Sequence, residues 1–98
     1  MKVYFESFDC LEDVVSNFNL SPEQLEGVEI LYAVYDSADY EGWAQVIFRK
    51  DGKLYEVHGS HCSCYGLEDQ WDPEETLVEA LIMRENVAEV AKEILRAL

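Results

Sequence analysis

Apolar side chains recur at helical spacing near the start of the chain. The stripe contains Phe8, Leu11, Val14, Val15 and Phe18, whereas Asp9, Glu12 and Asp13 lie off it. This spacing predicts an amphipathic helix with one face in the core. Ser7 precedes the stripe, and we expect its side chain to cap the helix. Cys10 lies at the edge of the stripe and is expected to pack as a small apolar residue.

A second helix signal follows in "NLSPEQLEG". Ser21 is a suitable N-cap, Pro22 fits the first helical position, and Gln24 completes a capping box. Gly27 follows so closely that the helix is expected to last about one turn.

Three segments in the middle of the chain are rich in β-branched and aromatic residues, which is typical of strands. They are "VEILYAVY" (28–35), "WAQVIFR" (43–49) and "KLYEVHG" (53–59). The first two are separated by the turn sequence "DSADYEG", and the last two by "KDGK", whose Asp-Gly pair is a strong hairpin signal. The pattern predicts a three-stranded antiparallel meander.

The C-terminal part is expected to be helical after an irregular loop over residues 59–72. In "DPEETLVEAL", Asp72 is a suitable N-cap, Pro73 fits the first helical position, and Glu75 is the third helical residue. Leu77 and Leu81 are then expected to face inward. The pattern continues through "NVAEVAKEILRAL", either as one helix or as two helices separated near residue 86.

Together these elements predict one α+β domain over residues 1–98. It would consist of an N-terminal helix, the three-stranded antiparallel meander, and a C-terminal helical region packed on the sheet. A chain of 98 residues is the size of one domain. Its 49% of hydrophobic residues can form a core and argue against general disorder.

Negative charge is strongly segregated along the chain. The formal net charge is −14, from 21 acidic and 7 basic residues, and no Lys or Arg occurs in residues 3–48 or 54–83. Such a field repels nucleic acid and anionic membranes and favours a basic partner. Solubility alone would also explain many acids on a small protein.

The sequence predicts a cytosolic location. No segment reaches the roughly 20 apolar residues that span a bilayer, and Glu6 and Asp9 interrupt the apolar start before it could serve as a secretory signal. Cys10, Cys62 and Cys64 are an odd number of cysteines, which suits free thiols in a reducing compartment.

The stretch "HGSHCSCYGL" (58–67) contains a cluster of potential zinc ligands. His61, Cys62 and Cys64 have the right side chains, but a C-x-C spacing within one loop is tighter than the usual zinc knuckle. A thiol nucleophile is the second interpretation, although the surrounding carboxylates disfavour a thiolate. In the third, Cys62 and Cys64 are packing residues, and Tyr65, Leu67 and Trp71 anchor the loop to the core.

The segment "DGKLYEVHGSHCSCYGLEDQWDPEETLVEAL" resembles a group of small uncharacterised bacteriophage and prophage proteins. These proteins share a hairpin followed by "GSHCSCYGLE", a Trp and then "PEE". The similarity extends upstream and covers roughly residues 27–84. It implies a phage gene that acts inside a bacterium, and it implies no particular mechanism.

These observations favour a non-catalytic phage accessory protein that binds a basic host protein and inhibits or redirects it. The host protein would handle nucleic acid, and the acidic surface would mimic nucleic acid as anti-CRISPR and anti-restriction proteins do. Direct binding to nucleic acid or membrane is not expected. The candidate contact residues are Glu68, Asp69, Asp72, Glu74, Glu75, Tyr40 and Trp43. No cofactor is required, although a zinc module formed by His61, Cys62 and Cys64 is the alternative, followed by a thiol-dependent enzyme.

Overall fold

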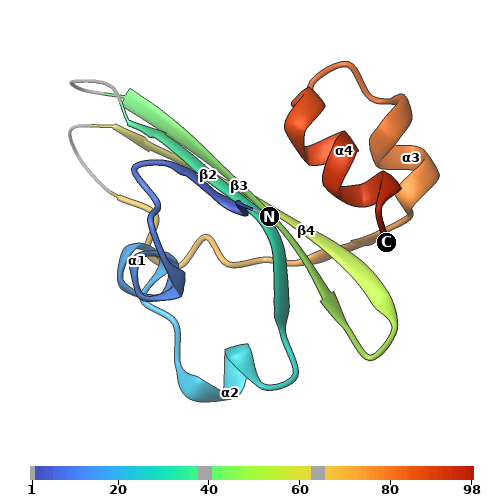
Figure 1. Cartoon of the computed structure of the whole chain (residues 1–98). Helices are drawn as coiled ribbons and strands as arrows, with labels where there is room; N and C mark the ends of the chain where they lie inside the picture. The colour runs from blue at the N-terminus through green and yellow to red at the C-terminus, as the bar shows by residue number, and fades with distance from the viewer. Residues whose placement is uncertain (1, 38–40, 63–65) are drawn as a thin grey trace.

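The computed structural model describes residues 2–37, 41–62 and 66–98, with the side chain of Cys62 outside the description (Figure 1). Along the chain, the elements are β1 (Tyr4–Glu6), α1 (Leu11–Phe18), α2 (Pro22–Leu25), β2 (Glu29–Ser37), β3 (Glu41–Lys50), β4 (Lys53–Cys62), β5 (Glu74–Thr76), α3 (Val78–Met83) and α4 (Glu89–Arg96).

All the strands belong to one mixed sheet, in the order β1-β2-β3-β4-β5. β1 is parallel to β2, and each of the other neighbouring pairs is antiparallel. The predicted fold, a three-stranded antiparallel meander after an N-terminal helix, is therefore wrong: the α+β protein has a five-stranded mixed sheet and begins with a strand. Both added strands have only three residues, which is too short for the alternation that identifies a strand in a sequence.

The chain leaves β1 in a way that also changes the start of α1. Glu6 has a positive φ of 58°, and the backbone N–H of Ser7 donates to the carbonyl of Tyr35 at 3.0 Å. Ser7 thus extends the pairing of β1 with β2. The prediction that its side chain caps α1 is wrong. Cys10 occupies the N-cap position, without a side-chain capping bond.

The predicted helix start at Asp72 is also wrong. Glu74–Thr76 forms β5, which pairs with residues 54–56 of β4, and α3 begins only at Val78. The Asp-Pro-Glu-Glu signal is local, whereas the unpaired edge of β4 offers this segment backbone hydrogen bonds that a sequence pattern does not reveal. Leu77 consequently takes the N-cap position and is 64% exposed instead of facing inward. β4 itself runs on to Cys62, so residues 59–62 are strand and not loop.

Two local predictions are confirmed. Asp51 and Gly52 connect β3 to β4 with φ values of 53° and 78°, which is the type I′ geometry that an Asp-Gly hairpin favours. The short helix α2 starts after Ser21, whose backbone N–H donates to Oε1 of Gln24 at 2.8 Å. The C-terminal region forms two helices, with the break at residues 84–88.

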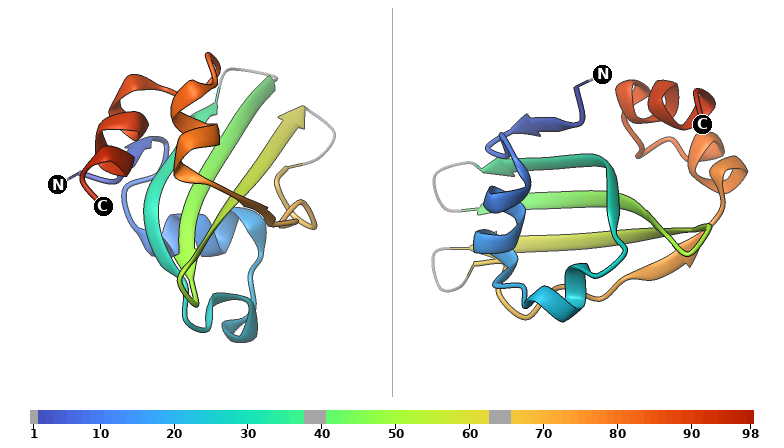
Figure 2. Two further views of the ribbon diagram at one scale, coloured as in Figure 1. Left: turned by 90° about the vertical axis from the view of Figure 1, so that its right-hand side faces the viewer. Right: turned by 60° about the horizontal axis from the view of Figure 1, so that its bottom comes forward.

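Helices lie on both faces of the sheet (Figure 2). We call the side of α1 and α2 the first face and the side of α3 and α4 the second face. The first core consists of Phe8, Val14, Phe18, Leu20, Ala33, Tyr35, Ala44, Val46, Phe48, Val57 and Leu67. The second consists of Leu31, Tyr32, Val34, Ile47, Leu54, Leu81, Val87, Ala91, Ile94 and Leu95. No helix in the described part of the chain is long and apolar enough to cross a membrane.

Residues 66–73 are attached to the first face by aromatic packing. Trp71 stacks on Phe48, with ring centroids 5.5 Å apart, and meets Phe18 edge-on at 5.2 Å. Leu67 is fully buried beside them. The side chain of Gln70 accepts from the backbone N–H of Ser60 and donates to its carbonyl, at 2.8 and 2.6 Å. These contacts confirm that Leu67 and Trp71 anchor the segment to the core, whereas Tyr65, the third predicted anchor, lies outside the described residues.

The two tryptophans are expected to differ in their effect on stability. Trp71→Ala should lower the free energy of unfolding by about 3 kcal/mol, because it removes two aromatic contacts and leaves a cavity over Phe48. Trp43→Ala, at a half-exposed position, is the matched control and should cost less than about 1 kcal/mol. Urea denaturation of both variants measures this difference. Equal losses of unfolding free energy in the two variants would show that the packing of Trp71 adds no more stability than an exposed tryptophan does.

Candidate functional site

A buried carboxylate lies on the second face of the sheet. Of the described residues, Gln45 and Glu56 are the buried polar ones, with exposed fractions of 3% and 6%. Both lie on the second face because their neighbours, such as Ala44 and Val57, alternate into the first core. Nε2 of Gln45 donates to Oε2 of Glu56 at 3.0 Å. Nε2 of His58 lies 2.7 Å from the same oxygen.

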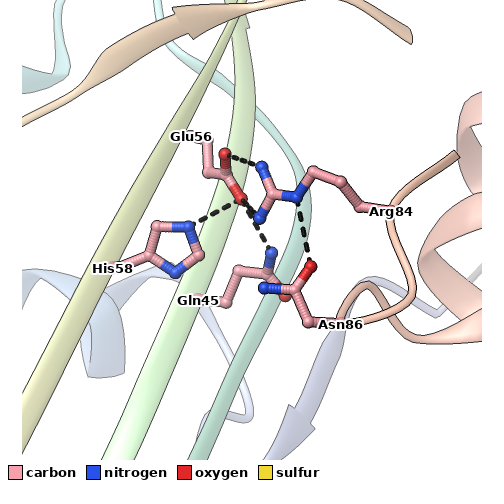
Figure 3. A network of polar contacts seen from close by, with 5 residues as sticks. All are labelled: Gln45, Glu56, His58, Arg84 and Asn86. Atoms are coloured by element: carbon pink, nitrogen blue, oxygen red, sulfur yellow. Dashed lines mark hydrogen bonds and ion pairs between the residues drawn. The ribbon is translucent and has the colours of Figure 1, made fainter. Parts of the chain in front are cut away.

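Arg84 reaches this carboxylate from the connection between α3 and α4 (Figure 3). Its two terminal nitrogens donate to the two oxygens of Glu56 at 2.6 and 2.7 Å, and its Nε donates to Oδ1 of Asn86 at 3.1 Å. A bidentate ion pair of this kind is stronger and more directional than a single hydrogen bond. It ties the C-terminal helices to the middle of β4.

The network keeps Glu56 ionised. Burial by itself raises the pKa of this carboxyl, but hydrogen bonds from Arg84 and Gln45, together with the charges of His58 and Arg84, outweigh it. The resulting pKa lies below that of an ordinary glutamate. A neighbouring cation and donated hydrogen bonds both favour the charged form of an acid.

Among the described elements, α3 and α4 cover only one end of the second face (Figure 2). Trp43 stands on this face, 49% exposed, opposite Asp36 of β2 and Ser60 of β4. A hollow of about 340 Å³ is lined by Asp36, Glu41, Gly42 and Trp43. A second hollow, of about 330 Å³, is lined by Trp43, Gln45, His58 and Asn86. We call this region the Trp43 surface.

The predicted contact residues do not gather around Trp43. Glu68, Asp69 and Asp72 are exposed, but their segment packs on the first face through Leu67 and Trp71. Glu74 and Glu75 are exposed on β5, where Glu74 lies opposite Glu56, and Glu75 pairs with Lys53 at 3.7 Å. Tyr40 lies outside the described residues. The set is thus divided between the two faces of the sheet.

His61 occupies a defined place on the first face. Its Nδ1 is hydrogen-bonded to the hydroxyl of Tyr35 at 2.8 Å, and the two rings meet edge-on. Gly42 lies opposite His61 on β3, and a side chain there would overlap the imidazole ring. The absence of a Cβ at Gly42 is therefore what lets His61 reach Tyr35.

The zinc hypothesis for His61, Cys62 and Cys64 is not decided by this geometry. Within residues 2–37, 41–62 and 66–98, no group of three or more His, Cys, Asp or Glu side chains could hold a metal ion. The side chain of Cys62 and the whole of Cys64 lie outside that description. A zinc module and a thiol-dependent enzyme therefore stay predictions.

The sequence analysis overlooked the polar network. Its members are Gln45, Glu56, His58, Arg84 and Asn86. Two of them could have been found, because Glu56 and His58 alternate with Tyr55 and Val57 and so share one face of a strand. Arg84 could not have been assigned to that face, since its contact with Glu56 joins residues 28 positions apart in the chain.

Comparisons with known proteins provide no relative for this chain: no family model, no curated protein and no solved structure matches it.

The Glu56–Arg84 pair is expected to be strongly coupled. In a double-mutant cycle with Glu56→Gln and Arg84→Met, the coupling energy should be about 1.5–3 kcal/mol, the range for hydrogen bonds to charged groups. The pair Arg49 and Glu29, whose side chains are 40% and 58% exposed, is the matched control and should give at most about 1 kcal/mol.

The contribution of Glu56 to stability should also decrease at low pH. Because the pKa of Glu56 is lowered by folding, its contribution is complete above the ordinary glutamate pKa of about 4.3 and is lost as the pH falls through the folded-state value. Urea denaturation of wild type and Glu56→Gln between pH 3 and 7 tests this. A stability difference that stays constant down to the lowest pH would contradict the assignment.

Proposed function

We propose that the protein is a non-catalytic binding protein that docks a basic partner on the Trp43 surface. The single observation that carries this proposal is the exposure of Trp43 on the second face of the sheet, where it lines two hollows. Tryptophan is one of the residue types enriched among those that dominate binding energies. A large aromatic side chain held half in water by a rigid strand is a suitable anchor for a partner.

The charge of the surface supports a basic partner. Asp36 and Glu41 line the hollow beside Trp43, and neither has an ion-pair partner among the described residues. The chain as a whole has a formal net charge of −14. An acidic field of this size accelerates encounter with a positively charged surface and disfavours an anionic one.

The resemblance to phage proteins supports a setting inside a bacterial cell. We propose that the partner is a basic host protein. A basic surface large enough to bind this acidic protein would be one that normally contacts nucleic acid. Occupation of that surface by the acidic protein would exclude the nucleic acid, as in anti-CRISPR or anti-restriction inhibition.

Binding to such a partner should depend on Trp43 and on salt. A host protein captured from bacterial lysate with the wild-type chain should bind Trp43→Ala at least about thirtyfold more weakly, which corresponds to a dominant contact of about 2 kcal/mol. Raising the salt concentration should weaken the complex, since exposed charges are screened over about 10 Å at 0.1 M. DNA should compete for the same partner. Leu11→Ala, at an exposed position on α1, is the matched control and should bind like wild type.

A comparison of two acid pairs identifies the face that is used. Asp36→Asn with Glu41→Gln should reduce both the affinity and its salt dependence, whereas Glu68→Gln with Asp69→Asn should have little effect. The opposite result would place the partner on the segment of residues 66–73 and overturn the proposal for Trp43. A partner indifferent to salt, DNA and both pairs would contradict the acidic-mimic function.

A further inference from the structure

The hollow between Trp43 and the buried network contains polar groups with fixed orientations. It has a volume of about 330 Å³ and is lined by Trp43, Gln45, His58 and Asn86. At one end, Gln45 is hydrogen-bonded to Glu56 and Asn86 to Arg84, and Nε2 of His58 lies 2.7 Å from Oε2 of Glu56 (Figure 3). Because these bonds determine the rotation of each amide or ring, they also determine what the other end presents to the hollow.

Gln45 presents an acceptor. Its Nε2 is used by Glu56, at 3.0 Å, and among the described residues no group donates to its Oε1. The same residues contain no buried side-chain polar atom that lacks a hydrogen-bond partner. Because Gln45 lines the hollow, Oε1 is the end of its amide that is left for a ligand, although the residue as a whole is only 3% exposed. A buried amide oxygen that points into a cavity is a fixed acceptor for a ligand.

His58 and Asn86 line the same hollow. Nε2 of His58 lies 2.7 Å from Oε2 of Glu56, so one edge of its ring is directed at the carboxylate. Oδ1 of Asn86 accepts from Arg84, so the amide nitrogen of Asn86 remains a donor. The oxygen of Gln45 is thus the acceptor that these side chains offer beside the Trp43 indole.

We infer that this hollow binds the guanidinium group of an arginine on the partner. A guanidinium is planar, carries five N–H donors and stacks on aromatic rings, so it can cover the Trp43 indole while it donates to Gln45. The charge of the neighbouring Arg84 is balanced by Glu56, and Asp36 and Glu41 lie on the other side of Trp43. This inference rests on the proposed function and names the side chain that the surface recognises.

Three blocked tripeptides test the inference without any host partner. Acetyl-Gly-Arg-Gly-amide should shift the NMR signals of the Trp43 indole N–H and the His58 ring in a saturable way. The citrulline peptide, which has the same shape without the charge, should bind about tenfold more weakly, and the lysine peptide, which cannot stack a planar group, about threefold more weakly. Equal affinities for arginine and citrulline, or signals that do not shift, would overturn the inference.

Two variants separate recognition from folding. Asn86→Asp keeps the oxygen that accepts from Arg84 and replaces the remaining donor by an acceptor. It should therefore bind the arginine peptide about fivefold more tightly and the citrulline peptide with little change. Trp43→Ala should lose binding of the arginine peptide, and Leu11→Ala should retain it. No gain in Asn86→Asp would contradict the site.

The outcomes also distinguish this inference from the proposed function. A host partner that requires Trp43, combined with peptides that bind equally or not at all, would disprove the arginine site and leave the docking surface intact. Selective arginine binding without any partner that depends on Trp43 would disprove the proposed function instead.

Discussion

The bidentate pair between Glu56 and Arg84 is the interaction on which the arrangement of the second face depends. A buried carboxylate would lose much of its solvation, and the hydrogen bonds from Arg84 and Gln45 offset that loss. Apolar packing alone would allow α3 and α4 to slide along the sheet, because hydrophobic burial has little directional preference. The two parallel hydrogen bonds restrict the pair to one position, and this position leaves the end of the sheet around Trp43 uncovered.

The same network links the stability of the fold to the shape of the binding surface. Gln45, His58 and Asn86 each use one end to hold Glu56 or Arg84 and present the other end to the hollow. A ligand therefore meets side chains that are already ordered, and it does not have to restrict their rotation on binding. Loss of Glu56 would release these groups together, so its substitution would affect recognition as well as folding.

The sequence predicted those parts of the fold whose signals are local. The Asp51–Gly52 turn and the capped helix at Ser21 depend on neighbouring residues and were identified correctly. β1 and β5 were missed because a three-residue strand exists only through its partner strand. Asp72 was misread for the same reason: a capping motif competes with backbone pairing to β4, and the chain nearby does not reveal that edge.

The candidate site divides in a similar way between local and long-range information. The exposure of Trp43 could be expected from its place near a turn, and the acidic character of the surface follows from the charge pattern. The hollow could not be expected, since it needs Arg84 and Asn86 beside strands that lie far from them in sequence. The charge of the surface and the shape of the hollow consequently make separate contributions to the binding of a partner. Asp36, Glu41 and the rest of the acidic field attract any basic surface over distances of about 10 Å, whereas the Gln45 oxygen and the Trp43 ring act only at contact. A surface that merely kept the protein soluble would need the first property and not the second.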